Sequence, residues 1–479
     1  MNTTPHSAPG RRTRDGRLDG GEGARRERRE ERILGYALLA LVFVSHAAIL
    51  MQHPVVGAAE NGDFSRVTGP AGIVSLDPYE AVDHKYVSQI YGVAPTRLGT
   101  LFSSAAVIAA GAKLLGVGAA TLDIRQVGCA YLVLFAAAFA QALWAGVPAL
   151  LCALLAWAAL DVSYSLYLNS FFADGAALLG FLGIVLGLLA WDGATGDRGR
   201  RRLSGALLVL AALIAAFSKH LYMLTPFLAA IAVVAWPSRA WTAQVRGAAL
   251  LLLALGLGGL LAVWHFTLGG GERFPEANRH HAVFSGLVRV ADDPAEVLVE
   301  LGIDPRSAAL AGTNFFRLSE EDRRLSTDAL RDVSSSRLAL AYLRDPHRVE
   351  RALAQTLPCL RLTTTADPNF SDRTRPPAFY RGWWQFAQLR GPLYPVALAL
   401  LIAGLLGLAR AAFLRTWRGA HAALAFLLLN AVVLVIAGVL GDGLLTLHRH
   451  LIGARFSLDL GLALVAYAIY RRLRALIHE

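Results

Sequence analysis

Residues 33–51 read ILGYALLALVFVSHAAILM, and these 19 residues contain no Asp, Glu, Lys or Arg. A helix that crosses a bilayer needs about 20 mainly apolar residues, so this stretch predicts a transmembrane helix. Residues 1–32 before it hold nine arginines and six acidic residues among Gly, Ser and Pro. We interpret them as a disordered basic cytosolic tail, because they are too long and too mixed in charge to begin a signal peptide.

The composition of the whole chain also indicates a membrane protein. Of its 479 residues, 55% are hydrophobic and 17% are charged, whereas soluble globular proteins contain about 25% charged residues. This composition excludes a collagen-like chain and a disordered regulator, and three scattered cysteines do not indicate a disulfide framework. The net charge of +11 lies largely in short loops beside apolar runs. It therefore indicates membrane topology, and we expect no nucleic-acid partner.

The apolar runs predict an all-α polytopic membrane protein with about ten transmembrane helices. After residues 33–51, the runs lie at 98–116, 126–144, 147–160, 174–191, 203–217, 222–236, 247–267, 391–409, 420–440 and 451–470. Polar residues interrupt 98–116, so we expect an interfacial helix along the outer surface there. In an alternative with the same number of crossings, 98–116 crosses the membrane and the 14-residue run 147–160 does not.

The charges of the connecting loops predict the orientation. If 98–116 does not cross, the cytosolic connections carry twelve Lys and Arg residues, and they lie near 191–203, 237–247, 410–418 and 471–474. The short outer connections then carry only Lys219, Arg449 and Arg455. Because Lys and Arg accumulate on the cytoplasmic side, both termini are expected in the cytosol.

Four parts follow from this topology. The tail 1–32 precedes a transmembrane module, 33–267, which includes a large outer loop, 52–125. Residues 268–390 are expected to form a small, mostly helical extracytoplasmic domain, because helical periodicity follows two Asp-Pro sequences there. Residues 391–479 supply the C-terminal transmembrane helices and a short cytosolic tail.

Polar residues gather at the outer boundary of the predicted bundle. Ionisable groups at membrane depth are costly and usually mark pathways or sites. The candidates are Asp63 in Asn61-Gly62-Asp63-Phe64, Arg125 in Asp123-Ile124-Arg125, Asn169 and Asp174 in the stretch 167–174, the pair Lys219 and His220, and Arg449 in His448-Arg449-His450. Five connections thus bring acids and bases to one face.

These residue types suit a lipid phosphate and an acceptor that loses a proton. Lys219 and Arg125 can hold a phosphate, and Asp63 can accept a proton or help to hold a divalent cation. Simpler readings stay open: Asp63 as a solvated loop acid, Asp174 as a helix cap, and Lys219 and Arg125 as interfacial anchors. His280 and His281, in Asn278-Arg279-His280-His281, could contact a metal or a pyrophosphate, or could be ordinary polar surface.

In this order, the residues resemble the GT-C superfamily of membrane glycosyltransferases, which take a sugar from a polyprenyl-phosphate carrier. The similarity of layout covers roughly residues 33–270. Within the superfamily the chain looks most like bacterial hexose transferases of cell-surface glycan assembly. The stretches that carry this finer similarity are 61–64, 167–172, 278–284 and 301–305. The chain departs from the pattern in having one acid in its first-loop motif and in reading Lys219-His220 where Lys-Gly is usual.

The resemblance implies an inverting transfer of a hexose or related sugar to a glycan or lipid acceptor, at the outer face of a bacterial inner membrane. Asp63 would be the general base, and Lys219 and Arg125 would stabilise the departing polyprenyl phosphate. Asp174, His220 and Asn169 would complete the donor site. Further contacts would come from His280, His281 and Arg449. No cofactor is certain, although a divalent cation (Mg or Mn) would be compatible.

Two other functions use the same features. A transporter or flippase of a lipid-linked sugar would need the same basic groups, but also access from both sides of the membrane. The chain could also be a non-catalytic membrane protein of envelope assembly, but that function would not explain why ionisable groups lie at membrane depth. The sequence contains no P-loop, GxSxG, HExxH or paired-cysteine motif.

Overall fold

The computed structural model describes residues 19–53, 55–60, 63–76, 87–96, 103–116, 119–194, 196–234, 247, 251–258, 274–361, 394–413, 418–444 and 447–478. Asn61, Gly62 and most of the predicted run 247–267 lie outside these residues. The described chain is mainly helical and also contains one small sheet.

The first half of the chain forms most of the bundle and its outer loop. Its helices are α1 (Asp19–Met51), α2 (Ser65–Ala71), α4 (Ser104–Ala112), α5 (Ile124–Trp144), α6 (Ala149–Ala159), α7 (Val162–Ser165), α8 (Asp174–Gly193), α9 (Arg198–Ala216) and α10 (Thr225–Val234), with 3₁₀ turns η2 (Lys113–Gly116) and η3 (His220–Tyr222). The strands are β1 (Ile73–Ser75), β2 (Ile90–Val93) and β3 (Thr121–Asp123).

The second half begins with a helical domain, residues 274–361. Its elements are α12 (Phe274–His280), the π-helix η4 (His281–Leu287), α13 (Val288–Val290), α14 (Pro294–Glu300), the 3₁₀ turns η5 (Pro305–Leu310) and η6 (Phe315–Arg317), α15 (Glu320–Ala329), α16 (Ser335–Arg344) and α17 (Pro346–Arg361). The chain then returns to the bundle through α20 (Tyr394–Phe413), α21 (Gly419–Asp442), α22 (Leu447–His450) and α23 (Ile452–His478).

Five helices among the described residues are long and apolar enough to cross a membrane. They are Arg29–Met51 within α1, Ile124–Trp144, Asp174–Gly193, Gly419–Asp442 and Ile452–Ile477 within α23. A helical membrane protein is therefore confirmed, whereas the count of about ten transmembrane helices stays a prediction.

Helix α1 begins earlier than expected. It starts at Asp19, so the disordered tail predicted for 1–32 is wrong for residues 19–32. Arg and Glu make up nine of these fourteen residues and are strong helix formers. The apolar helix that follows nucleates them, and Glu31 is anchored by an ion pair of 2.5 Å to Arg474 of α23.

The outer loop contains a sheet that the sequence analysis did not predict. The strands pair antiparallel in the order β1-β2-β3, with Ile73 opposite Val93 and Ile90 opposite Asp123. Strands of three or four residues are too short to show a period of two. Lys113 fastens this sheet to α2, because its Nζ donates to the carbonyl oxygens of Ala71 (2.6 Å) and Ala94 (3.0 Å).

The two short apolar helices differ in where they lie. α4 stays at one end of the bundle, where the Ser104 hydroxyl donates to the Ile214 carbonyl oxygen near the end of α9 (2.7 Å). α6 begins against Gly35 of α1, and the chain reaches the level of Leu50 at Asn169. Gly35 and Leu50 are about 22 Å apart at 1.5 Å per helical residue. Residues 149–169 therefore traverse the bundle, which favours 98–116 as the segment that does not cross.

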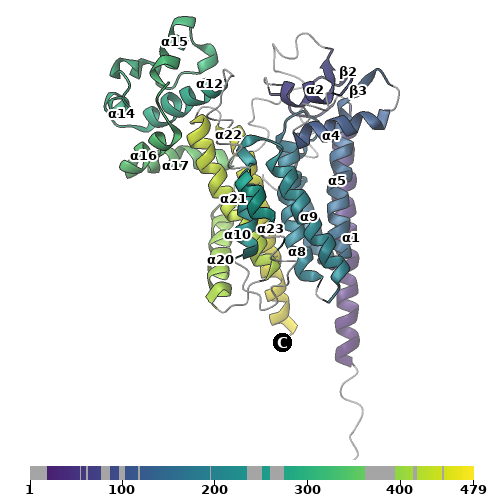
Figure 1. The fold of residues 1–479 in the computed structure, drawn as a ribbon. Coiled ribbons are helices and arrows are strands. Elements are labelled where there is room, and N and C mark those ends of the chain that lie inside the picture. Colours follow the sequence, from purple (N-terminus) through teal and green to yellow (C-terminus); the bar gives the residue numbers. More distant parts are fainter. Residues whose placement is uncertain are drawn as a thin grey trace, which may run out of the picture.

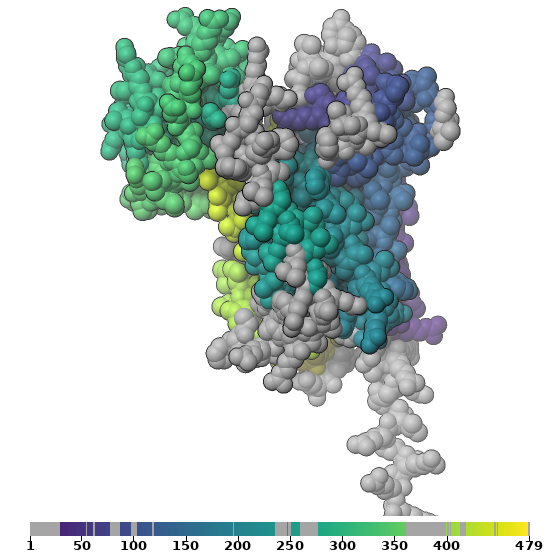
Figure 2. Space-filling model, viewed as in Figure 1, coloured from purple at the N-terminus to yellow at the C-terminus, as the bar shows by residue number. Residues whose placement is uncertain are grey.

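The charged groups divide between the two ends of the bundle. The beginning of α1 and the end of α23 lie together, and the guanidinium of Arg200 in α9 lies 5.2 Å from the Trp144 ring at the end of α5. The sheet, α2 and domain 274–361 lie at the opposite end (Figure 1). In Figure 2 the domain and the outer loop stand over the bundle as two lobes.

Helix α8 forms the centre of the bundle, since its whole apolar stretch is buried within the protein. It packs closely on α9 through small residues. A Cβ at Gly180 would lie 2.7 Å from the Ala215 backbone nitrogen, and one at Gly183 would lie 2.6 Å from the Ala211 Cβ. Small residues of this kind let two membrane helices approach closely, and here they fix the position of Asp174 at the start of α8.

Candidate functional site

Asp63 stands directly before α2, where an aromatic cluster holds the chain. Its neighbour Phe64 is buried, and the Phe64 ring packs edge-on against Phe171 (centroids 5.4 Å apart) and Phe172 (5.0 Å). The Phe64 backbone N–H also donates to the Glu60 carboxylate (3.1 Å). The outer loop is thus docked on the connection between α7 and α8, and Asp63 is placed above the bundle.

Several positive charges surround the Asp63 carboxylate. Its Oδ2 lies 3.0 Å from Arg449 Nη2, and its Oδ1 lies 3.5 Å from Arg66 Nη1. Burial works to raise the pKa of Asp63, but the charges of Lys219, Arg449, Arg66 and His450 together lower it below its usual value. The side chain keeps 24% of its surface exposed, so a ligand can reach a carboxylate that is ionised at neutral pH.

Asp174 and Lys219 meet in a second, more deeply buried pair. Lys219 Nζ lies 3.5 Å from Asp174 Oδ2, with 15% and 6% of their side-chain surfaces exposed. The Tyr222 hydroxyl donates to Asp174 Oδ1 at 2.5 Å. Asp174 is the first residue of α8 and not its cap, since the N-cap position is Ala173. Its carboxylate instead bonds to two side chains from the connection between α9 and α10.

His220 shares the connection with Lys219 and is exposed. Burial among surrounding protein atoms, followed by the charges of Lys219 and Arg66, lowers the pKa of His220 from 6.5 to about 4. At neutral pH the exposed His220 presents a neutral imidazole that can donate or accept a hydrogen bond.

The structure places Asn169 and Arg125 away from these pairs. Asn169 is buried, and its Nδ2 donates to the carbonyl oxygens of Leu50 (2.9 Å) and Val56 (2.8 Å). Arg125 binds Asp123 through Nε and Nη2 (3.0 and 2.5 Å) and donates to the Met51 carbonyl oxygen (3.3 Å). Asn169 ties the outer loop to the bundle, and Arg125 anchors the start of α5.

The two adjacent histidines have different surroundings. His280 is buried, with its ring nitrogens on the hydroxyl groups of Ser326 (2.7 Å) and Thr313 (3.0 Å). Burial, followed by the charge of His281, lowers the pKa of His280 to about 4. His281 instead reaches the bundle, where its Nδ1 lies 3.1 Å from Asp442 Oδ1. His280 thus holds the domain together, and His281 joins it to α21.

Arg449, a lower-ranked candidate from the sequence, occupies a central place. It pairs with Asp63, and its guanidinium lies 5.6 Å from the centre of the Phe172 ring. Sequence reasoning missed Arg66, Tyr222 and Asp442. Arg66 lies three residues after Asp63, and Tyr222 lies three residues after Lys219. Asp442 follows the end of an apolar run. Only these positions in the sequence could have indicated the three residues.

The family model for the YfdI N-terminal transmembrane domain matches residues 25–478. The chain belongs to this family. No curated protein matches the chain, and neither does any solved structure. Because the match extends over the bundle and over domain 274–361, family membership supports a membrane protein along nearly the whole sequence.

The donor atoms of this YfdI-family chain do not form a metal centre in the part that the structure describes. No group of three or more His, Cys, Asp and Glu side chains there could hold a metal ion. Asp63 and Asp174 each face cationic side chains instead. The described site residues therefore do not fit the divalent cation that the sequence allowed.

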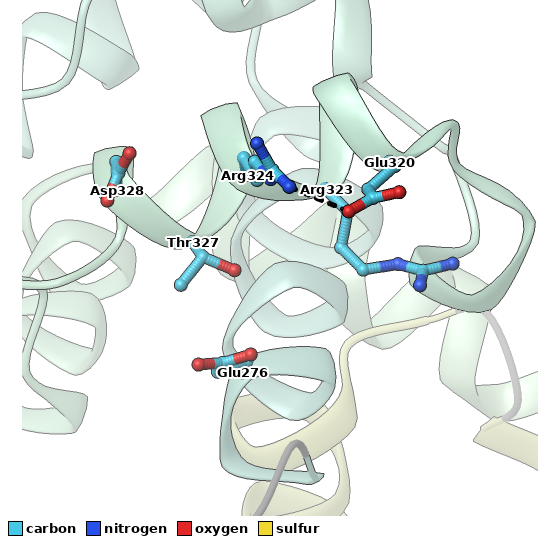
Figure 3. Close-up of a pocket in the computed structure, with 6 residues that line it drawn as sticks. All are labelled: Glu276, Glu320, Arg323, Arg324, Thr327 and Asp328. Carbon is cyan, nitrogen blue, oxygen red and sulfur yellow. Dashed lines mark hydrogen bonds and ion pairs between the residues drawn. The ribbon is translucent and has the colours of Figure 1, made fainter.

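A pocket of about 730 Å³ lies in domain 274–361, and none of the candidate residues lines it (Figure 3). Glu276 of α12 faces Thr327 of α15 across it, and Arg324 pairs with Glu320 (2.8 Å) on the same helix. The complete lining is Glu276, Glu320, Arg323, Arg324, Thr327 and Asp328. The charged side chains that line this pocket belong to the surface of the domain. We place the candidate site elsewhere, at Asp63, Asp174, Lys219, His220 and Arg449.

Proposed function

We propose that the protein is an inverting membrane glycosyltransferase of the GT-C type. It would move a hexose or related sugar from a polyprenyl-phosphate donor to a glycan or lipid acceptor of the cell envelope. The observation that carries this proposal is the convergence of Asp63, Arg449, Asp174 and Lys219, from four separate connections, at one end of the bundle.

The location of this convergence suits a lipid phosphate. The arginines near 198–202 and 471–474 lie at the other end of the bundle, and by the positive-inside rule that end faces the cytosol. The candidate site then faces the outer headgroup layer, where the phosphate of a polyprenyl lipid lies. Both termini would be cytosolic, and the host membrane would be a bacterial inner membrane.

In the proposed chemistry the Asp63 carboxylate and the two cations, Lys219 and Arg449, have separate roles. The acceptor hydroxyl attacks the anomeric carbon, its oxygen bonds to that carbon, and its proton passes to the Asp63 carboxylate. The bond between the anomeric carbon and the phosphate oxygen breaks on the opposite face, so the configuration inverts. Polyprenyl phosphate leaves with the bonding electrons, and Lys219 and Arg449 stabilise its growing negative charge.

Arg449 takes the phosphate role that the sequence analysis gave to Arg125. In the structure Arg125 binds Asp123 two residues away, whereas Arg449 lies beside Asp63, the proposed general base. Asp174 and Tyr222 would orient Lys219, and the neutral imidazole of His220 would bind a sugar hydroxyl. Asn169 would shape the site through the backbone that it holds.

Donor binding would also prepare the general base. The positive charges of Lys219, Arg449 and Arg66 hold the pKa of Asp63 below its usual value. A bound phosphate neutralises part of this charge, so the pKa of Asp63 rises and the carboxylate becomes a stronger proton acceptor. Proton transfer is thus favoured only when the donor is in place.

One experiment separates transferase from flippase. The purified protein is reconstituted into sealed vesicles with a panel of radiolabelled polyprenyl-phosphate hexoses, together with envelope glycan and lipid acceptors. We expect radiolabel to pass to one acceptor, and movement of the donor lipid between leaflets to equal that in protein-free vesicles. Leaflet movement without any labelled product would contradict the proposal and favour a flippase.

A further inference from the structure

The junction between domain 274–361 and the bundle is built around one carboxylate with a histidine on each side. Asp442, at the end of α21, has its Oδ1 3.1 Å from His281 Nδ1 and its Oδ2 2.5 Å from His450 Nε2. All three side chains are largely buried, with 12%, 5% and 22% of their surfaces exposed for Asp442, His281 and His450. We call these three side chains the His-Asp-His bridge.

The tautomer of His281 separates this bridge from a metal site. Its Nε2 accepts a hydrogen bond from the backbone N–H of Phe315 (3.1 Å). A neutral His281 therefore carries its proton on Nδ1 and donates it to Asp442. With both nitrogens engaged, His281 acts as a hydrogen-bonding link and not as a metal ligand.

The backbone is also closely packed at the junction between the domain and the end of α21. His281 begins the π-helix η4, a form of helix that occurs frequently at functional sites. Gly443 has a φ of +64°, and a Cβ there would lie 2.1 Å from the His281 carbonyl oxygen. The Leu444 N–H donates to the Ser285 carbonyl oxygen (3.3 Å). The domain and the end of α21 therefore share one interlocked surface.

The bridge leads directly to the candidate site. His450 follows Arg449 in the short helix α22, and Arg449 Nη2 lies 3.0 Å from Asp63 Oδ2. Four residues alone have little intrinsic helical stability, so α22 depends on its anchors. His450 bound to Asp442 supplies an anchor on one side, and Arg449 between Asp63 and the Phe172 ring supplies one on the other.

We propose that Asp442 is a positioning residue that couples domain 274–361, through His281 and His450, to the placement of Arg449 against Asp63. The inference rests on the proposed transferase activity and adds to it a link between the outer domain and the general base. A movement of the domain on acceptor binding would pass to Arg449 along this path.

The first test compares Asp442→Asn with the wild-type protein in the transfer assay. A misplaced group of this kind lowers the rate by about 100-fold, so we expect kcat to fall about 10- to 100-fold with little change in the donor KM. The acid limb of kcat/KM should move to higher pH, because Arg449 and His450 act with Lys219 and Arg66 to lower the pKa of Asp63. A purely structural role would not move that limb.

Conservative replacement supplies the matched comparison. His450→Gln keeps an N–H donor toward Asp442 and should retain most of the activity, whereas His450→Phe should resemble Asp442→Asn. Asp328→Asn, an exposed carboxylate on α15, is the control and should leave the rate unchanged. Equal rates and identical acid limbs for wild type, Asp442→Asn and His450→Phe would overturn the inference.

A second measurement does not depend on sugar transfer. Hydrogen exchange of the backbone in 281–287 and 447–450 is compared between the wild type and Asp442→Asn, or His450→Phe if the first variant does not fold. Faster exchange in both segments supports the coupling even if the wild type transfers no sugar, in which case only the proposed function fails. Unchanged exchange in 447–450 overturns the inference whether or not transfer occurs.

Discussion

The two ends of the α8–α9 pair carry ion pairs of opposite character. At one end Asp197 and Arg200 lie three residues apart on the chain, 3.1 Å from each other, with 50% and 41% of their side chains exposed. At the other end Asp174 begins α8, Lys219 lies in the connection after α9, and both side chains are almost fully enclosed. An exposed local pair contributes little to stability, whereas a buried one must offset a large desolvation cost. The enclosed end thus keeps charged groups at a cost in desolvation, as expected for the proposed site.

The largest effect is expected from Asp63→Asn at the enclosed end. The amide keeps the shape of the side chain but cannot accept the acceptor proton, and general-base catalysis contributes about 10²- to 10⁴-fold. We expect kcat for sugar transfer to fall by a factor in this range while the thermal unfolding temperature is maintained. Transfer at the wild-type rate by a folded variant would remove Asp63 from the mechanism.

Lys219→Gln should have the next largest effect. It removes the positive charge that the proposed mechanism places beside the leaving phosphate, and the loss of one such stabilising group costs about 10²- to 10³-fold. Initial rates at saturating donor measure the effect, and Arg324→Gln, an exposed cation of the outer domain, is the control. If both variants lose the same activity, Lys219 has no specific part in the site.

Between the two ends, Gly183→Leu should weaken the α8–α9 contact. A Cβ at Gly183 would lie 2.6 Å from the Ala211 Cβ, and the larger side chain would push the helices apart. Overpacking of this kind costs about 1–3 kcal/mol in free energy of unfolding. Thermal unfolding in detergent measures the change. Gly205→Ala, on the other helix, faces only the edge of the Trp191 ring at 3.3 Å and should cost less.

Arg449→Gln should shift the acid limb of the transfer rate. In the proposed mechanism Asp63 acts as its carboxylate. Because its neighbours lower the pKa of Asp63, we expect the wild-type activity to persist below the usual pKa range of an Asp. Removing Arg449 raises this pKa, so we expect the limb to move upward by about one pH unit, equivalent to about 1.4 kcal/mol. A pH–rate profile of kcat/KM measures it. A downward shift would contradict the assigned ion pair.

The smallest effect is expected from Asp197→Asn at the exposed end. Asn can still cap α9, as Asp197 does through Arg200 N (3.0 Å), so mainly the exposed charge pair is lost. Such pairs contribute about 0.3–0.5 kcal/mol, and transfer should be unaffected. A fall in transfer comparable to that of Lys219→Gln would erase the distinction between the two ends.

The sequence predicted the helical membrane fold and the face on which the polar residues gather. Runs of apolar residues and the positions of charged loops depend only on chain-local patterns, which is why α5, α8, α21 and α23 were recognisable. The small sheet was missed because β1 and β3 have three residues each. The charged start of α1 was predicted to be disordered, because composition alone does not show that it continues the apolar helix that follows.

The pairing of the site residues could not be predicted in the same way. Asp63 and Arg449 are 386 residues apart in the chain, and only the packing of the outer loop on the aromatic cluster brings them together. Arg125 had the right residue type and position, but Asp123 two residues earlier binds it. Which neighbour binds an arginine such as Arg125 depends on side-chain geometry. The same holds for the pairing of Tyr222 with Asp174.

Helix α8 is enclosed on all sides, whereas only one third of the apolar stretch of α1 is covered by protein. A change in acyl-chain length alters the hydrophobic thickness that lipid-facing helices must match, and they respond by tilting. In this molecule that adjustment would fall on the peripheral α1, while α8 keeps Asp174 at a constant depth. The candidate site would thereby be insulated from variation in the fatty acids of the membrane.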